Sequence, residues 1–261
     1  MLLIVDAGNT NICLAVYNDE NEPVYTARIY TERRKTSDQY AYDFKQILTS
    51  KYADPALYRG AVISSVVPEI TKKLEYAAHF ITGKKPLVLG VGVKTHLQIN
   101  TVNRGELGAD LVAGAVGAKA KYPMPCLIWD LGTCTKISVL GKNGEYLGCT
   151  ISPGIKMAIE ALGSNTSQLN QIDISDDVKC FGATTEASIS AGVITGTAVM
   201  LEGLSERILS GLGYEHATIV LTGGCASYVL PAVHTDIILD PSLVADGLCA
   251  IFSYNEPEAD Q

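Results

Sequence analysis

The sequence is poor in positive charge, and this absence limits the partners that the protein can bind. Its 261 residues contain 20 Lys and Arg against 28 Asp and Glu, which gives a formal net charge of -8 at pH 7. Nucleic acids and anionic membranes are bound through clustered Lys and Arg, so the charge balance argues against both as partners. It does not exclude a nucleotide, because a local group of backbone amides and a metal ion are enough to bind one.

The sequence also lacks the cysteine spacing of a metal site and the apolar runs of a targeting or membrane segment. Its seven cysteines are dispersed, without a Cys-x-x-Cys pair, which predicts reduced thiols in a cytoplasmic protein and no structural zinc. The run Leu2–Val5 is short and ends at Asp6, so we expect a buried strand there rather than a signal peptide. The apolar segments Val112–Ala120 and Ala191–Leu204 are interrupted by Gly and are shorter than a membrane span.

Strands and helices are predicted to alternate along the chain, which is typical of an α/β layered fold. The helix expected over 108–122 is rich in Ala and Gly. Such small residues allow close packing within the chain or, as an alternative, against a second copy of it. Strands are expected at 2–7, 13–17, 24–30, 61–67, 87–89, 126–131, 136–140, 146–151, 217–221 and 237–239, and helices at 37–50, 69–82, 108–122 and 186–211 and from 226 and 242.

The pattern that opens the chain returns in its second half. Ile4–Thr10 reads Ile-Val-Asp-Ala-Gly-Asn-Thr, and Ile128–Cys134 reads Ile-Trp-Asp-Leu-Gly-Thr-Cys. Each has a strand, an Asp, one apolar residue, a Gly and short polar side chains, followed by another strand. A repeat of this kind predicts a duplicated domain, with one half over residues 1–122 and the other over 123–261.

The two Asp turns have the chemistry of a phosphate site. A carboxylate at the end of a strand can hold Mg²⁺, while the backbone amides and hydroxyls of the following turn face phosphate oxygens. A third turn, Gly223-Gly224, follows an apolar strand and opens a helix, which allows the backbone to approach a flat or anionic ligand closely. We interpret Asp6 and Asp130 as the starts of two phosphate turns and Gly223-Gly224 as the adenosine loop.

Asp110 is the candidate base for a phosphoryl acceptor. It follows Gly108 and Ala109 at the start of the Ala-rich helix, where the helix dipole favours an ionised carboxylate. That carboxylate could orient a hydroxyl proton. An alternative role is to stabilise the helix end, and the helix alone does not distinguish the two.

Two phosphate turns and an adenosine loop resemble the actin/hexokinase/Hsp70 superfamily, and an ordered set of motifs resembles type III pantothenate kinases over essentially the whole chain. The superfamily resemblance implies two ribonuclease-H-like halves with the nucleotide in the cleft between them. The motifs are Asp6-Ala7-Gly8-Asn9-Thr10-Asn11, Lys35–Tyr40, Ser64-Ser65-Val66-Val67-Pro68, Gly108-Ala109-Asp110, Asp130-Leu131-Gly132-Thr133, Ser152-Pro153-Gly154, Thr185 and Thr222-Gly223-Gly224.

The family resemblance implies an ATP-dependent phosphorylation of pantothenate to 4′-phosphopantothenate, the first step of coenzyme A biosynthesis, by a homodimer. It implies that Asp110 is the general base, that Mg²⁺ comes with ATP, and that Asp130 helps to hold a monovalent cation, K⁺ or NH₄⁺. The implied nucleotide contacts are Asp6, Gly8, Asn9, Thr10, Asn11, Thr133, Gly223 and Gly224, and the implied pantothenate contacts are Thr101, Gly108, Ala109, Asp110, Leu111 and Thr185.

The sequence departs from the family pattern in the acceptor motif. Leu111 replaces an Arg that could pair with the pantothenate carboxylate, Thr101 replaces an aromatic residue, and Asn103-Arg104 replaces Asn-Pro. Loss of an Arg–carboxylate contact costs about 1.5–3 kcal/mol, although Arg104 could supply a charge from nearby. The alternatives are therefore a kinase of another small alcohol and a nucleotide-binding protein without kinase activity. A dinucleotide-binding oxidoreductase is disfavoured, because the first turn lacks the G-x-G-x-x-G spacing and leads into a strand.

Overall fold

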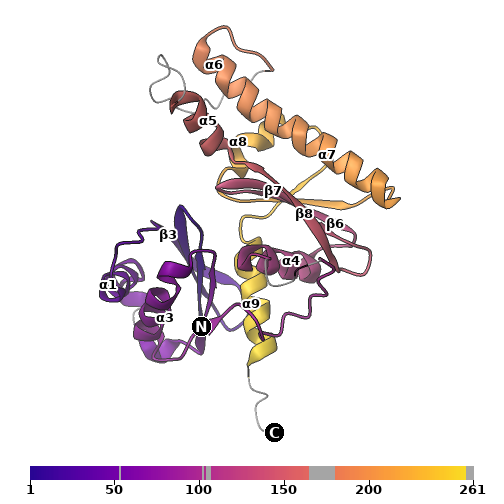
Figure 1. The fold of residues 1–261 in the computed structure, drawn as a ribbon. Helices are drawn as coiled ribbons and strands as arrows, with labels where there is room; N and C mark the ends of the chain where they lie inside the picture. Colours follow the sequence, from indigo (N-terminus) through magenta and orange to yellow (C-terminus); the bar gives the residue numbers. More distant parts are fainter. Residues whose placement is uncertain (53, 102, 104–106, 165–179, 257–261) are drawn as a thin grey trace. The chain divides into compact units, whose positions relative to one another are not determined.

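The computed structural model describes residues 1–52, 54–101, 103, 107–164 and 180–256 (Figure 1). The chain divides into two compact units. The first combines Met1–Leu97 and Val102–Lys121 with Ser242–Gln261, and the second combines Gln98–Thr101 with Tyr122–Pro241. The sequence-based boundary placed the last twenty or so residues in the second half, whereas the structure groups the C-terminal helix with the first unit.

The first unit contains a five-stranded mixed sheet with the strand order β3-β2-β1-β4-β5. The first three strands form an antiparallel meander, and β4 and β5 extend the sheet from β1 as parallel strands. The strands are β1 (Leu2–Ala7), β2 (Asn11–Tyr17), β3 (Pro23–Tyr30), β4 (Gly60–Ser65) and β5 (Leu87–Val88).

Helices cover both faces of this sheet, which explains why β1 is an almost continuous apolar run. On one face Leu3 and Val5 share a core with Phe44 of α1 (Ser37–Ile47) and Leu74 of α3 (Pro68–Thr82). The other face is covered by α4 (Ala109–Lys121) and α9 (Leu243–Asn255). The short helices α2 (Thr49–Tyr52) and η1 (Pro55–Leu57) connect α1 to β4.

The helices α4 and α9 lie side by side with almost no space between their backbones (Figure 1). A Cβ atom added to Gly117 would lie 2.3 Å from the Leu243 carbonyl oxygen, and one added to Gly247 would lie 1.8 Å from the Ala113 carbonyl oxygen. The small residues of α4 therefore pack within the chain, the first of the two alternatives that the sequence left open.

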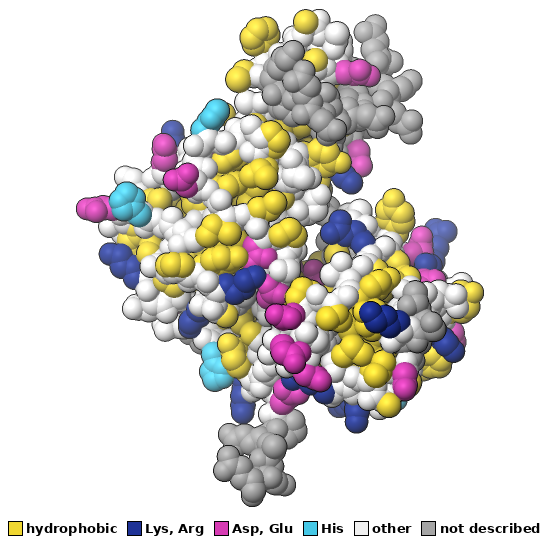
Figure 2. All heavy atoms as spheres, turned by 180° about the vertical axis from the view of Figure 1, so that it is seen from behind, with side chains coloured by type: hydrophobic (Ala, Val, Ile, Leu, Met, Phe, Trp, Pro, Cys, Tyr) yellow, Lys and Arg dark blue, Asp and Glu magenta, His cyan; other side chains and the backbone are white. Residues whose placement is uncertain are grey.

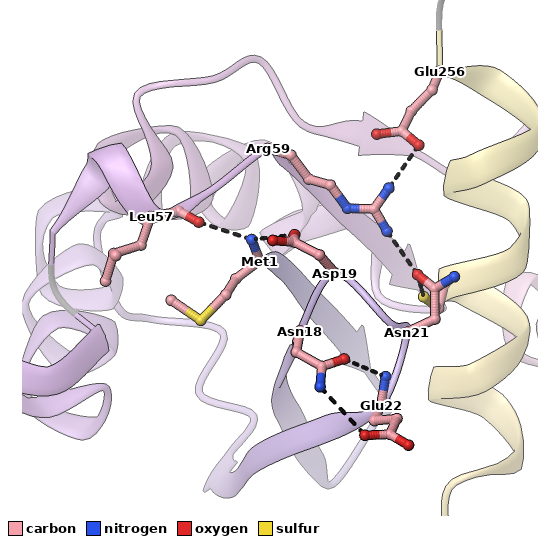
Figure 3. A network of polar contacts seen from close by, with 9 residues as sticks. Met1, Asn18, Asp19, Asn21, Glu22, Leu57, Arg59 and Glu256 are labelled. Atoms are coloured by element: carbon pink, nitrogen blue, oxygen red, sulfur yellow. Dashed lines mark hydrogen bonds and ion pairs between the residues drawn. The ribbon is translucent and has the colours of Figure 1, made fainter.

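A polar network fixes the end of α9 to the first unit (Figure 3). The Arg59 guanidinium donates to the Glu256 carboxylate at 2.6 Å and to Asn21 Oδ1 at 2.8 Å. In the same network the amino group of Met1 donates to Asp19 Oδ1 at 3.0 Å. Segments from both ends of the chain thus meet on one unit, which no local sequence pattern indicates.

The second unit has its own five-stranded sheet, with the order β10-β9-β6-β7-β8. Its first three strands in sequence form an antiparallel meander, and β9 and β10 extend it as parallel strands. The strands are β6 (Cys126–Leu131), β7 (Cys134–Leu140), β8 (Tyr146–Pro153), β9 (Thr218–Thr222) and β10 (Ile238–Leu239).

The predicted duplication is confirmed, because the two sheets have the same topology. β1 and β6 have the same order of buried and half-buried positions, and so have β2 and β7. In both meanders the register between the second and third strands shifts at the same place, between Val16 and Tyr17 in one and between Val139 and Leu140 in the other. These matches place Asp6 and Asp130 at equivalent positions.

One face of the second sheet is covered by helices that include one the sequence did not predict. That helix is α5 (Ile155–Ser164), whose Ile155 and Ile159 join a core with Trp129 of β6. The expected long helix is observed as α6 (Thr185–Ser190), a π-helical turn η3 (Ala191–Thr195) and α7 (Gly196–Leu212). The helix expected from 226 is short and is followed by one 3₁₀ turn, giving α8 (Ala226–Val229) and η4 (Leu230–Ala232).

The helix expected over 186–211 is confirmed as the continuous helical segment Thr185–Leu212. By length and composition it is the one helix of the described residues that could cross a membrane, and 28% of its most apolar window is buried. Its buried positions include Ile194, Ala198 and Leu201, which pack against the second sheet. On its polar side the Glu202 carboxylate accepts hydrogen bonds from the backbone of His234 and Thr235, which ties the helix to the same unit.

Candidate active site

Phosphate turn one, Gly8-Asn9-Thr10, joins β1 to β2 and is held by the end of β3. The Gly8 amide donates to the Asn11 carbonyl at 2.9 Å, and the Thr31 hydroxyl donates to the Gly8 carbonyl at 2.6 Å. The Thr31 amide donates to the Thr10 carbonyl at 2.9 Å. These bonds fix the backbone while the side chains of Asn9 and Thr10 are exposed, as a turn that contacts a ligand requires.

Asp6 lies at the end of β1, with Cys13 of β2 on one side and Ser64 of β4 on the other. Cys13 is directly opposite in β2, and burial raises the pKa of its thiol, so the thiol stays neutral at pH 7. Ser64 is beside Asp6 in β4, and its buried hydroxyl oxygen has no hydrogen-bond partner among the residues described. A carboxylate and a hydroxyl on one edge of a sheet fit a hydrated Mg²⁺ that arrives with a nucleotide.

Asp110 lies at the same end and on the same face of the first sheet as Asp6. It is in the first turn of α4, where the Leu111 amide donates to Asp110 Oδ1 at 2.9 Å. A Cβ atom on Gly108 would lie 2.6 Å from that oxygen and 3.8 Å from Val66, which follows β4. The shared face follows from β4. Gly60 contacts Phe252 of α9, so Gly60 lies on the face that α4 and α9 cover. Alternate residues of a strand share a face, so Ser64 and its β1 neighbour Asp6 lie on that face too.

Two basic residues near phosphate turn one were not among the sequence-predicted site residues. The Arg33 guanidinium donates to Asn9 Oδ1 at 3.3 Å and contacts the Glu69 carboxylate at 3.4 Å. The Lys73 ammonium donates to the Arg33 carbonyl at 2.9 Å, so it holds the segment that carries Arg33. The signal available in the sequence was the run Arg33-Arg34-Lys35 next to a predicted family motif.

Phosphate turn two, Gly132–Thr133, joins β6 to β7 and is enclosed by close backbone contacts. The Gly132 amide donates to the Cys134 carbonyl at 3.1 Å. A Cβ atom on Gly154, just after β8, would lie 2.2 Å from the Thr133 carbonyl oxygen. Only glycine fits at residue 154, which explains the Ser152-Pro153-Gly154 motif as part of this turn.

The adenosine loop candidate, Gly223-Gly224, lies against the same strand end. Gly223 has a φ of 97°, and a Cβ atom there would lie 2.5 Å from the Leu131 backbone. The Cys225 amide donates to the Leu131 carbonyl at 2.9 Å. The positive φ and the close backbone approach both need glycine at residue 223. These contacts with Leu131 bring the loop next to phosphate turn two within the second unit.

Asp130 has a charged partner that the sequence interpretation did not include. The Lys136 ammonium is 2.8 Å from Asp130 Oδ2, and the side chains are 13% and 21% exposed respectively. A monovalent cation at Asp130 would therefore meet a positive charge already in contact with that carboxylate. The residues present do not fit a K⁺ or NH₄⁺ ion at Asp130 in the way that the resemblance implied.

The remaining predicted acceptor residues are not gathered in one unit. Thr101 belongs to the second unit, where its buried hydroxyl has no hydrogen-bond partner among the residues described, and Thr185 is the exposed first residue of α6. Ala109 and Leu111 flank Asp110 in the first unit and are half-buried. Arg104, the alternative source of positive charge, lies outside the described residues.

Comparison with known proteins gives one consistent family. A family model for type III pantothenate kinase matches residues 2–207. A type III pantothenate kinase of Exiguobacterium sibiricum is 35% identical over 256 residues, which cover 98% of this chain and 100% of that protein. A type III pantothenate kinase of Acholeplasma laidlawii is 36% identical over 255 residues, covering 98% and 99%.

Solved structures with low sequence identity have the same fold. A conserved putative Baf family transcriptional activator from Campylobacter jejuni has a TM-score of 0.61 at 17% identity, covering 97% of this chain and 98% of that one. The activator of 2-hydroxyisocaproyl-CoA dehydratase from Clostridium difficile, with bound ADPNP, has a TM-score of 0.58 at 15% identity, covering 100% and 99%. A putative 2-dehydro-3-deoxygalactonokinase from Sinorhizobium meliloti has a TM-score of 0.59 at 14% identity, covering 100% and 99%. These likenesses confirm the actin-like ATPase and sugar kinase fold.

Proposed function

Because the chain belongs to the type III pantothenate kinase family, we propose that it transfers the γ-phosphoryl group of ATP to the 4′-hydroxyl of pantothenate. The product is 4′-phosphopantothenate, and the reaction is the first step of coenzyme A biosynthesis. The observation that carries the proposal is the position of Asp6 and Asp110 at one end and on one face of the first sheet. That arrangement puts a phosphate turn beside a carboxylate suited to an alcohol acceptor.

Asp110 acts as the general base. The first turn of α4 favours its ionised form, so the carboxylate accepts the proton of the 4′-hydroxyl as the oxygen attacks phosphorus. Phosphoryl transfer depends mainly on alignment and charge stabilisation, so orienting the hydroxyl is the larger part of this role.

The nucleotide is held through backbone and short polar side chains. In the first unit, Asn9 and Thr10 of turn one, with Asn11 at the start of β2, would contact phosphates. In the second unit, Thr133 of turn two would contact phosphates, and Gly223 and Gly224 would approach the adenosine. Asp6 would hold the Mg²⁺ that arrives with ATP, and the ion would neutralise charge on the phosphates. A monovalent cation, K⁺ or NH₄⁺, was implied at Asp130, but the Lys136 ammonium competes with it there.

A second candidate function is phosphorylation of an uncharged alcohol related to pantothenate. Leu111 favours it, because a half-buried leucine beside Asp110 offers no positive charge to a substrate carboxylate. Pantothenate and pantothenol differ in this one group, so they distinguish the two functions. A nucleotide-binding protein without kinase activity is the remaining alternative.

The test is ADP release by the purified protein with MgATP and either pantothenate or pantothenol. We expect pantothenate to give the higher kcat/KM. A higher kcat/KM with pantothenol would favour the second function, and no ADP release with either compound would exclude both.

The proposal includes a homodimer in the cytoplasm. Its support is the outer side of the helix Thr185–Leu212, where Val199 is 60% exposed and Cβ atoms on Gly192, Gly196 and Gly203 would meet nothing within 4 Å. Such a surface allows close approach of a second helix.

On the face drawn in Figure 2, Lys and Arg side chains lie interspersed with Asp and Glu, which fits a small-molecule enzyme better than a nucleic-acid partner.

A further inference from the structure

Phosphate turn two contains a cation that belongs to the chain itself. Asp130 and Lys136 lie directly opposite each other in the antiparallel pair of β6 and β7, so their side chains are on the same face of the sheet. The ammonium nitrogen is 2.8 Å from Asp130 Oδ2. Both side chains are largely shielded, at 13% exposed for Lys136 and 21% for Asp130, so solvent screens the pair less than it would a surface ion pair.

The first half of the molecule provides an internal comparison. Asp6 is equivalent to Asp130, and the residue opposite Asp6 in β2 is Cys13. Cys13 and Lys136 are each the third residue of their strand, with the same order of buried positions around them. The duplicated scaffold therefore places a neutral thiol opposite one Asp and an ammonium group opposite the other.

The ion pair lies beside the amides that are expected to bind phosphate. A Cβ atom on Gly132 would lie 3.4 Å from Asp130 Oδ1, so the carboxylate lies next to the turn. Thr222, which precedes the adenosine loop, is the neighbour of Asp130 on the other side, in β9. A positive charge fixed at this point is placed to stabilise phosphate oxygens that bind to turn two.

We propose that the Lys136 ammonium is the resident cation of phosphate turn two, so that nucleotide binding requires neither K⁺ nor NH₄⁺. A lysine side chain ends in the same kind of N–H donor group as NH₄⁺. Because it is tethered 2.8 Å from Asp130, its local concentration greatly exceeds that of a free ion. The inference rests on the proposed ATP site but not on the identity of the acceptor.

The test measures the affinity of the full-length protein for the Mg²⁺ complex of a non-hydrolysable ATP analogue by calorimetry. The measurements are made in KCl, NH₄Cl and choline chloride at equal ionic strength, since choline is too large to replace K⁺ at a carboxylate. We expect the dissociation constants of the unmodified protein to agree within about twofold in the three salts. A dissociation constant higher by about tenfold or more in choline chloride would overturn the proposal.

A variant separates the charge of Lys136 from its packing. Lys136→Met keeps most of the apolar stem and removes the ammonium group. We expect it to bind the analogue about tenfold more weakly in choline chloride and to recover in KCl or NH₄Cl, because a free ion can then reach Asp130. Equal loss in all three salts, or no loss in any, contradicts the resident-cation role.

Lys142→Met is the matched control. Lys142 follows β7 at the end opposite to the turn, is exposed, and lies over the Tyr214 ring at 4.8 Å from its centroid. Its removal lowers the net charge of the same hairpin equally, and we expect no salt-dependent change in affinity. If Lys136→Met fails to fold, the salt comparison on the unmodified protein still decides. Because the readout needs no pantothenate, failure of the proposed acceptor leaves this test intact.

Discussion

At the scale of single residues, Asp110 has two roles that can be separated by experiment. Its position in the first turn of α4 stabilises the helix through the dipole, and its carboxylate is the proposed base. The first role affects the stability of the fold and the second affects only turnover. A substitution that keeps the shape of the side chain distinguishes them.

We predict that Asp110→Asn lowers turnover by about 10²–10⁴-fold, because an amide cannot accept the hydroxyl proton. The loss of the helix-dipole interaction should cost no more than about 1 kcal/mol of unfolding free energy. Affinity for the ATP analogue should not change. Single-turnover kinetics, thermal unfolding and calorimetry measure the three quantities.

The matched control for this prediction is Glu69→Gln. Glu69 is a first-turn carboxylate of α3 in the same unit, and its ion pair with Arg33 is exposed, with both side chains more than half accessible. We expect a small effect on stability and full turnover. If Asp110→Asn retained turnover as well as Glu69→Gln does, Asp110 would be a helix-stabilising residue alone.

At the scale of helices and strands, the contact of α4 with α9 depends on individual glycines. A Cβ atom on Gly117 would lie 2.3 Å from the Leu243 carbonyl oxygen, whereas one on Gly114 would lie 3.8 Å from Val244, an ordinary contact. Both residues are inside α4, so helix propensity alone favours alanine equally at each position. The packing against α9 gives the two substitutions opposite signs.

We predict that Gly114→Ala raises the thermal midpoint and that Gly117→Ala lowers it. The first gains up to about 1 kcal/mol from helix propensity, and the second loses about 1–3 kcal/mol through overpacking. Thermal unfolding followed by circular dichroism measures both. A rise in the midpoint for both variants would show that α9 does not lie against Gly117.

The elements that the sequence predicted correctly are those with strong local signals. The strands around Asp6 and Asp130 were predicted because short apolar runs end at Asp and Gly, and their repetition identified the duplication. The helix α5 was missed although Ile155 and Ile159 are spaced as on one helix face, because that pattern is short and follows the Ser152-Pro153-Gly154 motif directly. The ends of the helix expected over 37–50 were also inexact, since α1 ends at Ile47.

The candidate site was predictable as far as its residues follow one another along the chain. The phosphate turns, the Gly223-Gly224 loop and Asp110 all have local patterns. Lys136 was missed because its meaning depends on strand register, which places it opposite Asp130. Counting back from the turn in the predicted hairpin would have revealed this pairing.

At the scale of the whole molecule, duplication explains the common scaffold and divergence explains the chemistry. Two sheets of identical topology carry an Asp at the same position, yet one faces Cys13 and the other Lys136. The C-terminal helix α9 belongs to the first unit. Its packing there depends on close glycine contacts with α4 and not on its order in the sequence. Family membership therefore gives the reaction, whereas the local differences between halves give the properties specific to this chain.

The most direct test of the central claim is to identify the product made from MgATP and pantothenate by mass spectrometry and ³¹P NMR. We predict 4′-phosphopantothenate, a phosphate monoester on the primary hydroxyl, formed in equal amounts with ADP and absent when Asp110→Asn replaces the unmodified protein. ADP that accumulates while pantothenate stays unmodified would contradict the account.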